Sequence, residues 1–203
     1  MNRRELLGCL GLFPLVLALH PAEALALGGV LPPLDQPAPD FDLEGVLPSG
    51  KGKASKAVVG QRSLADFGGR WLVLYFYPRD FTGGCTLEAR GFQRDLVAFH
   101  QAGAEVVGIS ADDPESHASF CGSEELTFPL LSDPGGQVSQ SYGSWIAPFS
   151  QRHTFLIDPE GILRSNWLAV RPQGHSQEVL EALRKLQTTP LSRSAQGSPQ
   201  AQG

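Results

Sequence analysis

Two short, largely apolar runs mark the centre of the chain, from Trp71 to Tyr77 and from Ala104 to Ser110. Both are rich in bulky or β-branched side chains, which is typical of strands that are buried on both faces. Between them, from Cys85 to Ala102, apolar residues recur at helical spacing, and Gly103 is placed to end that helix. A strand, a helix and a second strand in this order predict parallel pairing through a right-handed crossover, and therefore an α/β sheet.

The pattern after this unit predicts two more helices and a hairpin. Asp112-Asp113-Pro114 opens a helix that runs to about Glu124, and residues 136–142 suggest a short one. The apolar runs 153–158 and 162–168 are separated by Pro-Glu-Gly, a strong turn signal, so they should pair antiparallel. Residues 176–186 form an amphipathic helix that would cover the sheet.

Weaker strand patterns precede the central unit. Asp42 to Val46 and Ala57 to Gly60 could pair across a loop rich in Gly, Lys and Ser. Ser63 is a plausible N-cap for a short helical turn that leads into the Trp71 strand.

Composition limits the class of protein. The 203 residues are 41% hydrophobic and 18% charged, which fits one globular domain with enough apolar material for a core. The net charge of −5 and the pI of about 5.5 come without a basic stripe, so nucleic acid is excluded as the expected partner.

The two ends of the chain are expected to lie outside that domain. Residues 1–26 have the basic start, apolar stretch and small-residue cleavage positions of an export signal. Pro14 interrupts an apolar run that is too short to span a bilayer, so we expect no stable membrane insertion. The signal indicates export to a periplasm or thylakoid lumen, by general secretion or by the twin-arginine route. The folded domain would cover residues 27–188, and the polar residues 189–203 would be disordered.

Cys85 is the first candidate for chemistry, because it lies at or near the start of the predicted central helix. Unpaired backbone N–H groups and the positive end of the helix dipole favour a thiolate there, and the thiolate is the nucleophilic form. Taken alone, however, a cysteine in this position is more often an inert packing thiol.

The residues ahead of Cys85 are informative. Pro78, Thr82 and Cys85 fit the pattern P-x-x-x-T-x-x-C, within the string FYPRDFTGGCTLEA, after a buried strand and at the opening of a helix. This segment resembles the active site of the peroxiredoxins, in the peroxiredoxin Q or bacterioferritin comigratory protein branch. The resemblance runs from about Pro37 to about Leu186. It implies a thioredoxin-like α/β fold with peroxiredoxin-type N-terminal strands and a central mixed sheet flanked by helices.

The resemblance also implies roles for individual residues. Cys85 would be the peroxidatic nucleophile, Thr82 would position the peroxide, and Pro78 would shield the sulfur from water. The family arginine that is written R-x-T-F matches Arg152, which would favour the thiolate and stabilise the leaving oxygen. Glu88 matches a family glutamate that orients this arginine, although a glutamate on a helix surface facing solvent is an alternative.

A second thiol would resolve the sulfenic acid that forms on Cys85. The commonest subfamily position for this thiol, five residues on, is Arg90 here. Other members carry it in the next helix, and Cys121 lies 36 positions after Cys85. The resemblance therefore implies an intramolecular disulfide between Cys85 and Cys121. A buried packing role for Cys121 beside Phe120 remains the alternative.

The function expected from this resemblance is a thiol-dependent peroxidase that reduces hydrogen peroxide and organic hydroperoxides. Thioredoxin or a related dithiol would recycle it, and it would act as a monomer without a cofactor. Two alternatives stay open, a thiol-disulfide oxidoreductase of the thioredoxin fold and a non-catalytic exported binding domain. The chain has no C-x-x-C, which argues against the first and also against a metal site. The histidines point the same way, because no close ligand pair is formed by His100, His117, His153 and His175.

Overall fold

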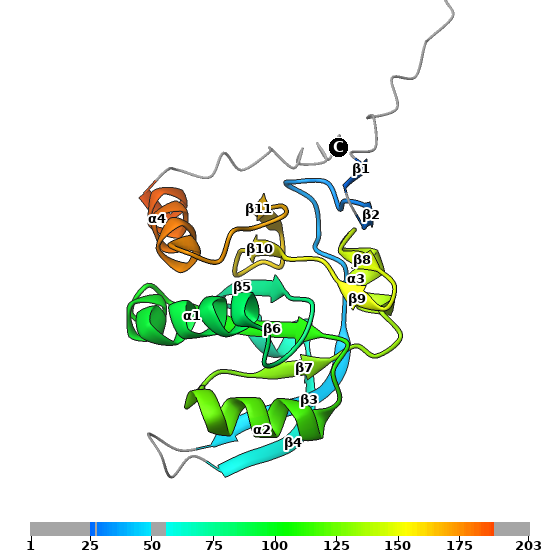
Figure 1. Cartoon of the computed structure of the whole chain (residues 1–203). Helices are drawn as coiled ribbons and strands as arrows, with labels where there is room; N and C mark the ends of the chain where they lie inside the picture. The colour runs from blue at the N-terminus through cyan, green and yellow to red at the C-terminus, as the bar shows by residue number, and fades with distance from the viewer. Residues whose placement is uncertain (1–24, 27, 50–55, 189–203) are drawn as a thin grey trace, which may run out of the picture.

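The computed structural model describes residues 25–26, 28–49 and 56–188. Its centre is a seven-stranded mixed sheet in the order β11-β10-β5-β6-β7-β3-β4 (Figure 1). The strands of this sheet are β3 (Asp42–Ser49), β4 (Lys56–Ser63), β5 (Trp71–Phe76), β6 (Ala104–Ser110), β7 (Leu130–Ser132), β10 (His153–Ile157) and β11 (Leu163–Trp167). The helices are α1 (Gly83–Gln101), α2 (Pro114–Glu124), α3 (Gln137–Ser141), α4 (His175–Thr188) and the 3-10 turn η2 (Leu64–Phe67).

The central strands pair as the apolar pattern predicts. All six residues of β5 are buried, and β5 runs parallel to β6. On its other side β5 pairs antiparallel with β10, which continues into the antiparallel partner β11. The expected N-terminal strand pair is also present, as the antiparallel pair of β3 and β4, and it is longer at its turn end than the sequence pattern indicates.

Alternate side chains of the sheet point into two cores. Val73 and Tyr75 of β5 pack with Phe92 of α1 on the face that α1, α2 and α4 cover. Leu74 and Phe76 pack on the other face, in a cluster that includes residues of the N-terminal segment and of η2. Three helices therefore lie on one side of β5 and β6, with the start of α1 at the end of β5 (Figure 1).

Local capping explains where the helices begin and end. Thr82 is the N-cap of α1, so this helix starts two residues earlier than predicted and Cys85 is its third residue. Gly103 has φ of +68° just after α1, a conformation that glycine adopts without strain. The side chain of Asp113 accepts a hydrogen bond from the Ser116 amide and caps α2. Ser63 and Asp66 form a capping box on η2.

Two features of the fold were not predicted from the sequence. β7 is a third parallel strand beside β6. A small hairpin of β8 (Trp145–Ile146) and β9 (Phe149–Ser150) also precedes β10.

Residues 1–24, 27, 50–55 and 189–203 lie outside the described residues, so the predicted tail and nearly all of the predicted export signal lie outside them too. The last two residues of the predicted export signal are described, and they form β1 (Leu25–Ala26), which pairs with β2 (Gly29–Val30). Within the described part, no helix combines the length and the apolar character that crossing a membrane requires.

Gly45 and Gly60 face each other across β3 and β4, and they make a matched pair for a stability test. A Cβ atom on Gly45 would lie 2.2 Å from the Leu130 carbonyl oxygen, whereas one on Gly60 would meet only the end of the Leu47 side chain at 3.0 Å. We expect Gly45→Ala to lower the free energy of unfolding by about 3 kcal/mol or more, because β3 and β7 must separate. Gly60→Ala should cost less than about 1 kcal/mol in the same denaturant titration. Equal losses for both variants would contradict this account of the β3–β7 contact.

Candidate active site

Cys85 lies in the first turn of α1, where the helix has unpaired N–H groups. The thiol is 1% exposed, at the edge of the core that α1 forms with β5. The loop from Pro78 to Thr82 connects the end of β5 to this turn. The sequence prediction of a cysteine at a helix start that follows a buried strand is confirmed.

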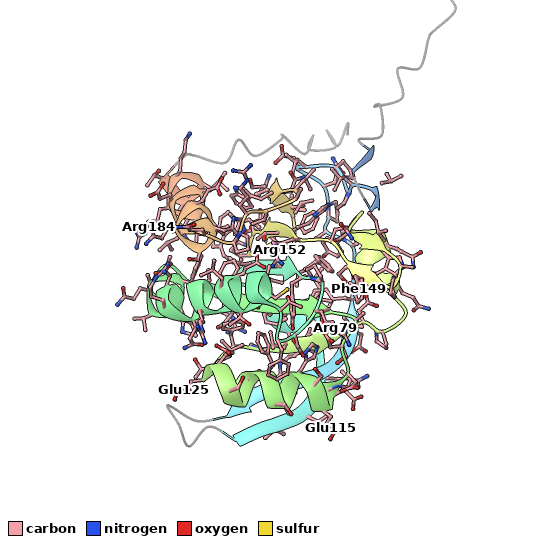
Figure 2. All side chains as sticks on the ribbon, in the orientation of Figure 1. Arg79, Glu115, Glu125, Phe149, Arg152 and Arg184 are labelled. Atoms are coloured by element: carbon pink, nitrogen blue, oxygen red, sulfur yellow. The ribbon has the colours of Figure 1, made fainter. Side chains whose placement is uncertain are left out.

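Arg152 comes directly before β10, which lies on the side of β5 opposite to β6. His153 of β10 pairs with Phe76 of β5, so the residue before β10 lies next to the loop that leaves β5. The Arg152 Nη2 group donates a hydrogen bond to the Cys85 Sγ atom over 3.3 Å. Its backbone carbonyl accepts one from the Val170 amide at 2.9 Å, which fixes the base of the side chain. Figure 2 shows Arg152 between α1 and α4.

Glu88 holds the other arm of the same guanidinium. The Arg152 Nη1 group donates to Glu88 Oε2 at 2.5 Å, and the glutamate side chain is only 1% exposed. The alternative of a solvent-facing Glu88 is therefore wrong. Burial raises the pKa of Glu88 to about 7, even though the charge of Arg152 and its hydrogen bond act to lower it. Glu88 Oε1 is buried and has no hydrogen-bond partner among the described residues, which fits this loss of solvation.

Thr82 and Pro78 lie in the loop ahead of Cys85. The Thr82 hydroxyl is exposed and donates to the Arg79 carbonyl at 3.1 Å, while the Thr82 carbonyl accepts from the Thr86 amide in the first helical turn. Pro78 is half-buried where β5 ends. The structure thus brings Cys85, Glu88 and Arg152 into contact and places Thr82 one turn away. The roles of Thr82 and Pro78 toward a peroxide stay predictions.

Cys121 is a free, buried thiol in the second half of α2. Burial, together with the nearby charge of Asp80, raises the pKa of Cys121 to about 12. The thiol is therefore protonated and weakly nucleophilic in this conformation. Phe120, its neighbour in the helix, packs against Phe81 from the loop before Cys85, with ring centroids 5.1 Å apart. α2 and the active-site loop are in direct contact.

A polar cluster that sequence reasoning missed lies beneath that loop. Ligand atoms of Asp80, Asp112 and His117 all fall within 4.8 Å of one another, a grouping that could hold a metal ion. However, the Asp80 oxygens accept hydrogen bonds from Tyr77 and Ser116 and contact His117, whose other ring nitrogen faces a backbone carbonyl. These donor atoms are already used within the protein, so the cluster fits a hydrogen-bond network better than a metal centre. The sequence gives no sign of this cluster, because Asp80 and His117 are 37 positions apart and form no short-spaced motif.

The fold is that of a family of thiol peroxidases. The chain matches the AhpC/TSA family over residues 34–166, and it belongs to that family. It is a peroxidase of the peroxiredoxin type.

The named relatives narrow the comparison to one branch. Peroxiredoxin Bcp of Xanthomonas campestris is 37% identical over 160 residues, which cover 74% of this chain and 94% of that protein. Peroxiredoxin Bcp of Bacillus subtilis is 34% identical over 161 residues, covering 75% and 96%. A solved structure of Xanthomonas campestris peroxiredoxin Q is 37% identical, with a TM-score of 0.60 over 62% of this chain and 84% of that one. The expected family and thioredoxin-like fold are confirmed.

Gly84 and Gly83 provide a test of how closely Arg152 must approach. A Cβ atom on Gly84 would lie 3.1 Å from Arg152 Nη2, whereas one on Gly83 would have nothing within 4 Å. We expect Gly84→Ala to displace the guanidinium and to slow peroxide reduction on the order of tenfold. Gly83→Ala is the matched control and should leave the rate unchanged, with a stability gain of about 0.4–1 kcal/mol. Stopped-flow kinetics of the reduced variants measures both, and equal rates would contradict the role of close approach.

The raised pKa of Glu88 gives a pH prediction. The neutral acid should dominate below about pH 7 and the carboxylate above it, so the charged pair with Arg152 forms as the pH rises through 7. We expect the carboxyl infrared band of a buried acid to disappear over this range. Glu88→Gln should remove that change in the infrared spectrum. A band that persists in the variant, or one that titrates near pH 4, would show that burial does not raise the pKa of Glu88.

Proposed function

We propose that Cys85 reduces hydrogen peroxide and organic hydroperoxides, and that Cys121 resolves the product within the same chain. The observation that carries this proposal is the pair of Arg152 contacts, one to Cys85 Sγ and one to Glu88 Oε2. A thiol beside a fixed cation, at the start of a helix, is set up to react as a thiolate. A related protein of known structure, the bacterioferritin comigratory protein of Xanthomonas campestris, has alkyl peroxide reduction activity.

The first step transfers one oxygen atom to sulfur. The Cys85 thiolate attacks the nearer peroxide oxygen, a sulfur–oxygen bond forms and the O–O bond breaks. Cys85 leaves this step as a sulfenic acid, and the second oxygen leaves with the electron pair and takes up a proton to give water or an alcohol. Arg152 is placed to stabilise the negative charge on that leaving oxygen, and the Thr82 hydroxyl to position the peroxide.

The second step forms a disulfide. The Cys121 thiol attacks the Cys85 sulfenic acid, a sulfur–sulfur bond forms and water leaves. Because burial holds Cys121 in the protonated form, the thiol must leave its site in α2 before it can react. Local unwinding of α2 provides that movement, since a disulfide needs Cα atoms within about 7 Å.

A dithiol reductant closes the cycle, returns Cys85 and Cys121 to thiols and is itself oxidised to a disulfide. We infer that the protein works as a monomer after export. The donor would then be thioredoxin or a thioredoxin-like protein in the periplasm or thylakoid lumen.

Substitution of each thiol tests the cycle. We expect Cys85→Ser to abolish peroxide turnover, because the nucleophile is lost. Cys121→Ser should still react once with peroxide at the wild-type rate and then accumulate the Cys85 sulfenic acid. Rapid mixing followed by trapping of the sulfenic acid and peptide mapping measures both outcomes. Normal turnover by Cys85→Ser would overturn the assignment of the nucleophile, and normal turnover by Cys121→Ser would return Cys121 to a packing role.

A further inference from the structure

Asp80 and His117 join the active-site loop to the first half of α2. The Asp80 and His117 side chains are buried, and His117 Nδ1 lies 2.9 Å from Asp80 Oδ2. The Ser116 hydroxyl donates to the same Asp80 oxygen at 2.8 Å, and the Tyr77 hydroxyl donates to the other one at 2.8 Å. Asp112 accepts from the Asp80 amide at 2.9 Å and so fixes the loop backbone as well.

Both ring nitrogens of His117 have polar partners. Nδ1 lies 2.9 Å from Asp80 Oδ2 and 3.4 Å from the Tyr77 hydroxyl oxygen, and Nε2 lies 3.3 Å from the backbone carbonyl oxygen of Leu131. The side chains of His117 and Asp80 are both buried. Opening this contact would leave polar groups in the interior without hydrogen-bond partners, which makes it a firm attachment.

The second half of α2 is held less firmly. Beyond Cys121 the helix is tied to α1 by Arg90 and Glu124, whose side chains are 65% and 11% exposed. Water weakens an ion pair at such a position. Gln93 of α1 also forms hydrogen bonds with Thr127, just after the helix. Gly122 directly follows Cys121, and the helix ends at Glu125 with a φ of +53°, an uncommon conformation for a residue with a side chain.

Figure 2 shows how the two halves lie. Glu115 marks the end of α2 on the side of Arg79, the residue next to Asp80, and Glu125 marks the opposite end. The buried Asp80–His117 contact is thus near one end of the helix, and the partly exposed Arg90–Glu124 ion pair is at the other.

We propose that the buried Asp80–His117 contact is a latch that stays closed while α2 unwinds from Cys121 onward, and that it guides Cys121 to Cys85. This inference rests on the proposed disulfide step. His117 lies four residues before Cys121, on the same face of α2, and Asp80 lies five residues before Cys85. Residues 118–121 span about 6 Å while they stay helical, and the five residues after Asp80 reach roughly 17 Å when extended, so the two sulfurs can meet without opening the latch.

The latch also shortens the effective loop between the thiols. Along the chain Cys121 is 36 positions from Cys85, whereas the path through the latch contains the five residues after Asp80 and the four after His117. The entropic cost of closing a flexible loop of n residues grows as (3/2)RT ln n. A fourfold shorter loop therefore raises the effective concentration of one thiol near the other by up to about eightfold.

Hydrogen exchange in the wild-type protein tests the latch directly. We compare the reduced protein with protein that has been oxidised by one equivalent of peroxide, after peptide mapping of the same sample. Amides 117–120 should keep their protection in the oxidised protein, and amides 122–126 should lose it. Equal loss in both halves overturns the latch while leaving the disulfide step intact. Absence of the Cys85–Cys121 disulfide from the map removes the proposed resolving step, and the latch with it.

His117→Gln provides the kinetic test, because it removes the ring that contacts Asp80 and leaves Asp80, whose charge acts on Cys121, in place. We expect the Cys85 sulfenic acid to convert to disulfide several-fold more slowly, up to about eightfold, relative to the first reaction with peroxide. A longer-lived sulfenic acid should also give more sulfinic acid at high peroxide. Ser119→Ala, an exposed change in the same helix, is the matched control and should leave both rates unchanged. An equal or faster conversion in His117→Gln overturns the proposal, and the exchange experiment decides if this variant does not fold.

Discussion

The site depends on one buried cation, the guanidinium of Arg152. Its side chain is 15% exposed, so it requires partners, and it finds them in Glu88 and Cys85 on successive turns of α1. This contact constrains the sheet as well as the helix. A shift of one residue between β10 and β5 would turn the β10 side chains to the opposite face and remove Arg152 from the thiol. The pairing of β10 with β5 and the start of α1 at Gly83 are therefore requirements of the chemistry.

The sequence predicts the parts of this structure that leave a local pattern. The buried runs of β5 and β6 and the helix between them were predictable from periodicity, and the Pro78 to Cys85 motif from family resemblance. β7 and the β8–β9 hairpin contain only two or three residues per strand, too few to show a period. The burial of Glu88 could not be decided, because helical spacing shows which residues share a face and not what covers that face. The Asp80–His117 pair is set by tertiary packing alone.

The two thiols lie in opposite electrostatic environments within one core. Cys85 has a guanidinium nitrogen 3.3 Å from its sulfur. Cys121 is surrounded by apolar side chains and senses the negative charge of Asp80, and both effects oppose ionisation. In the proposed cycle, Cys85 is therefore the sulfur that meets peroxide first, and Cys121 is protected from it. The same burial that protects Cys121 means that reaching it requires a change of conformation.

The location of that change follows from how α2 is stabilised. A helix of eleven residues is marginal by itself in water, so its stability comes from tertiary contacts. Those contacts are uneven, since the half before Cys121 has the buried Asp80–His117 contact and a capping aspartate, and the half after it has a partly exposed ion pair and a glycine. A segment with fewer buried contacts opens at a lower free-energy cost than a segment with many. Unwinding that begins at the exposed end reaches Cys121 before it reaches His117, so the thiol can be released while the helix start remains attached to the active-site loop.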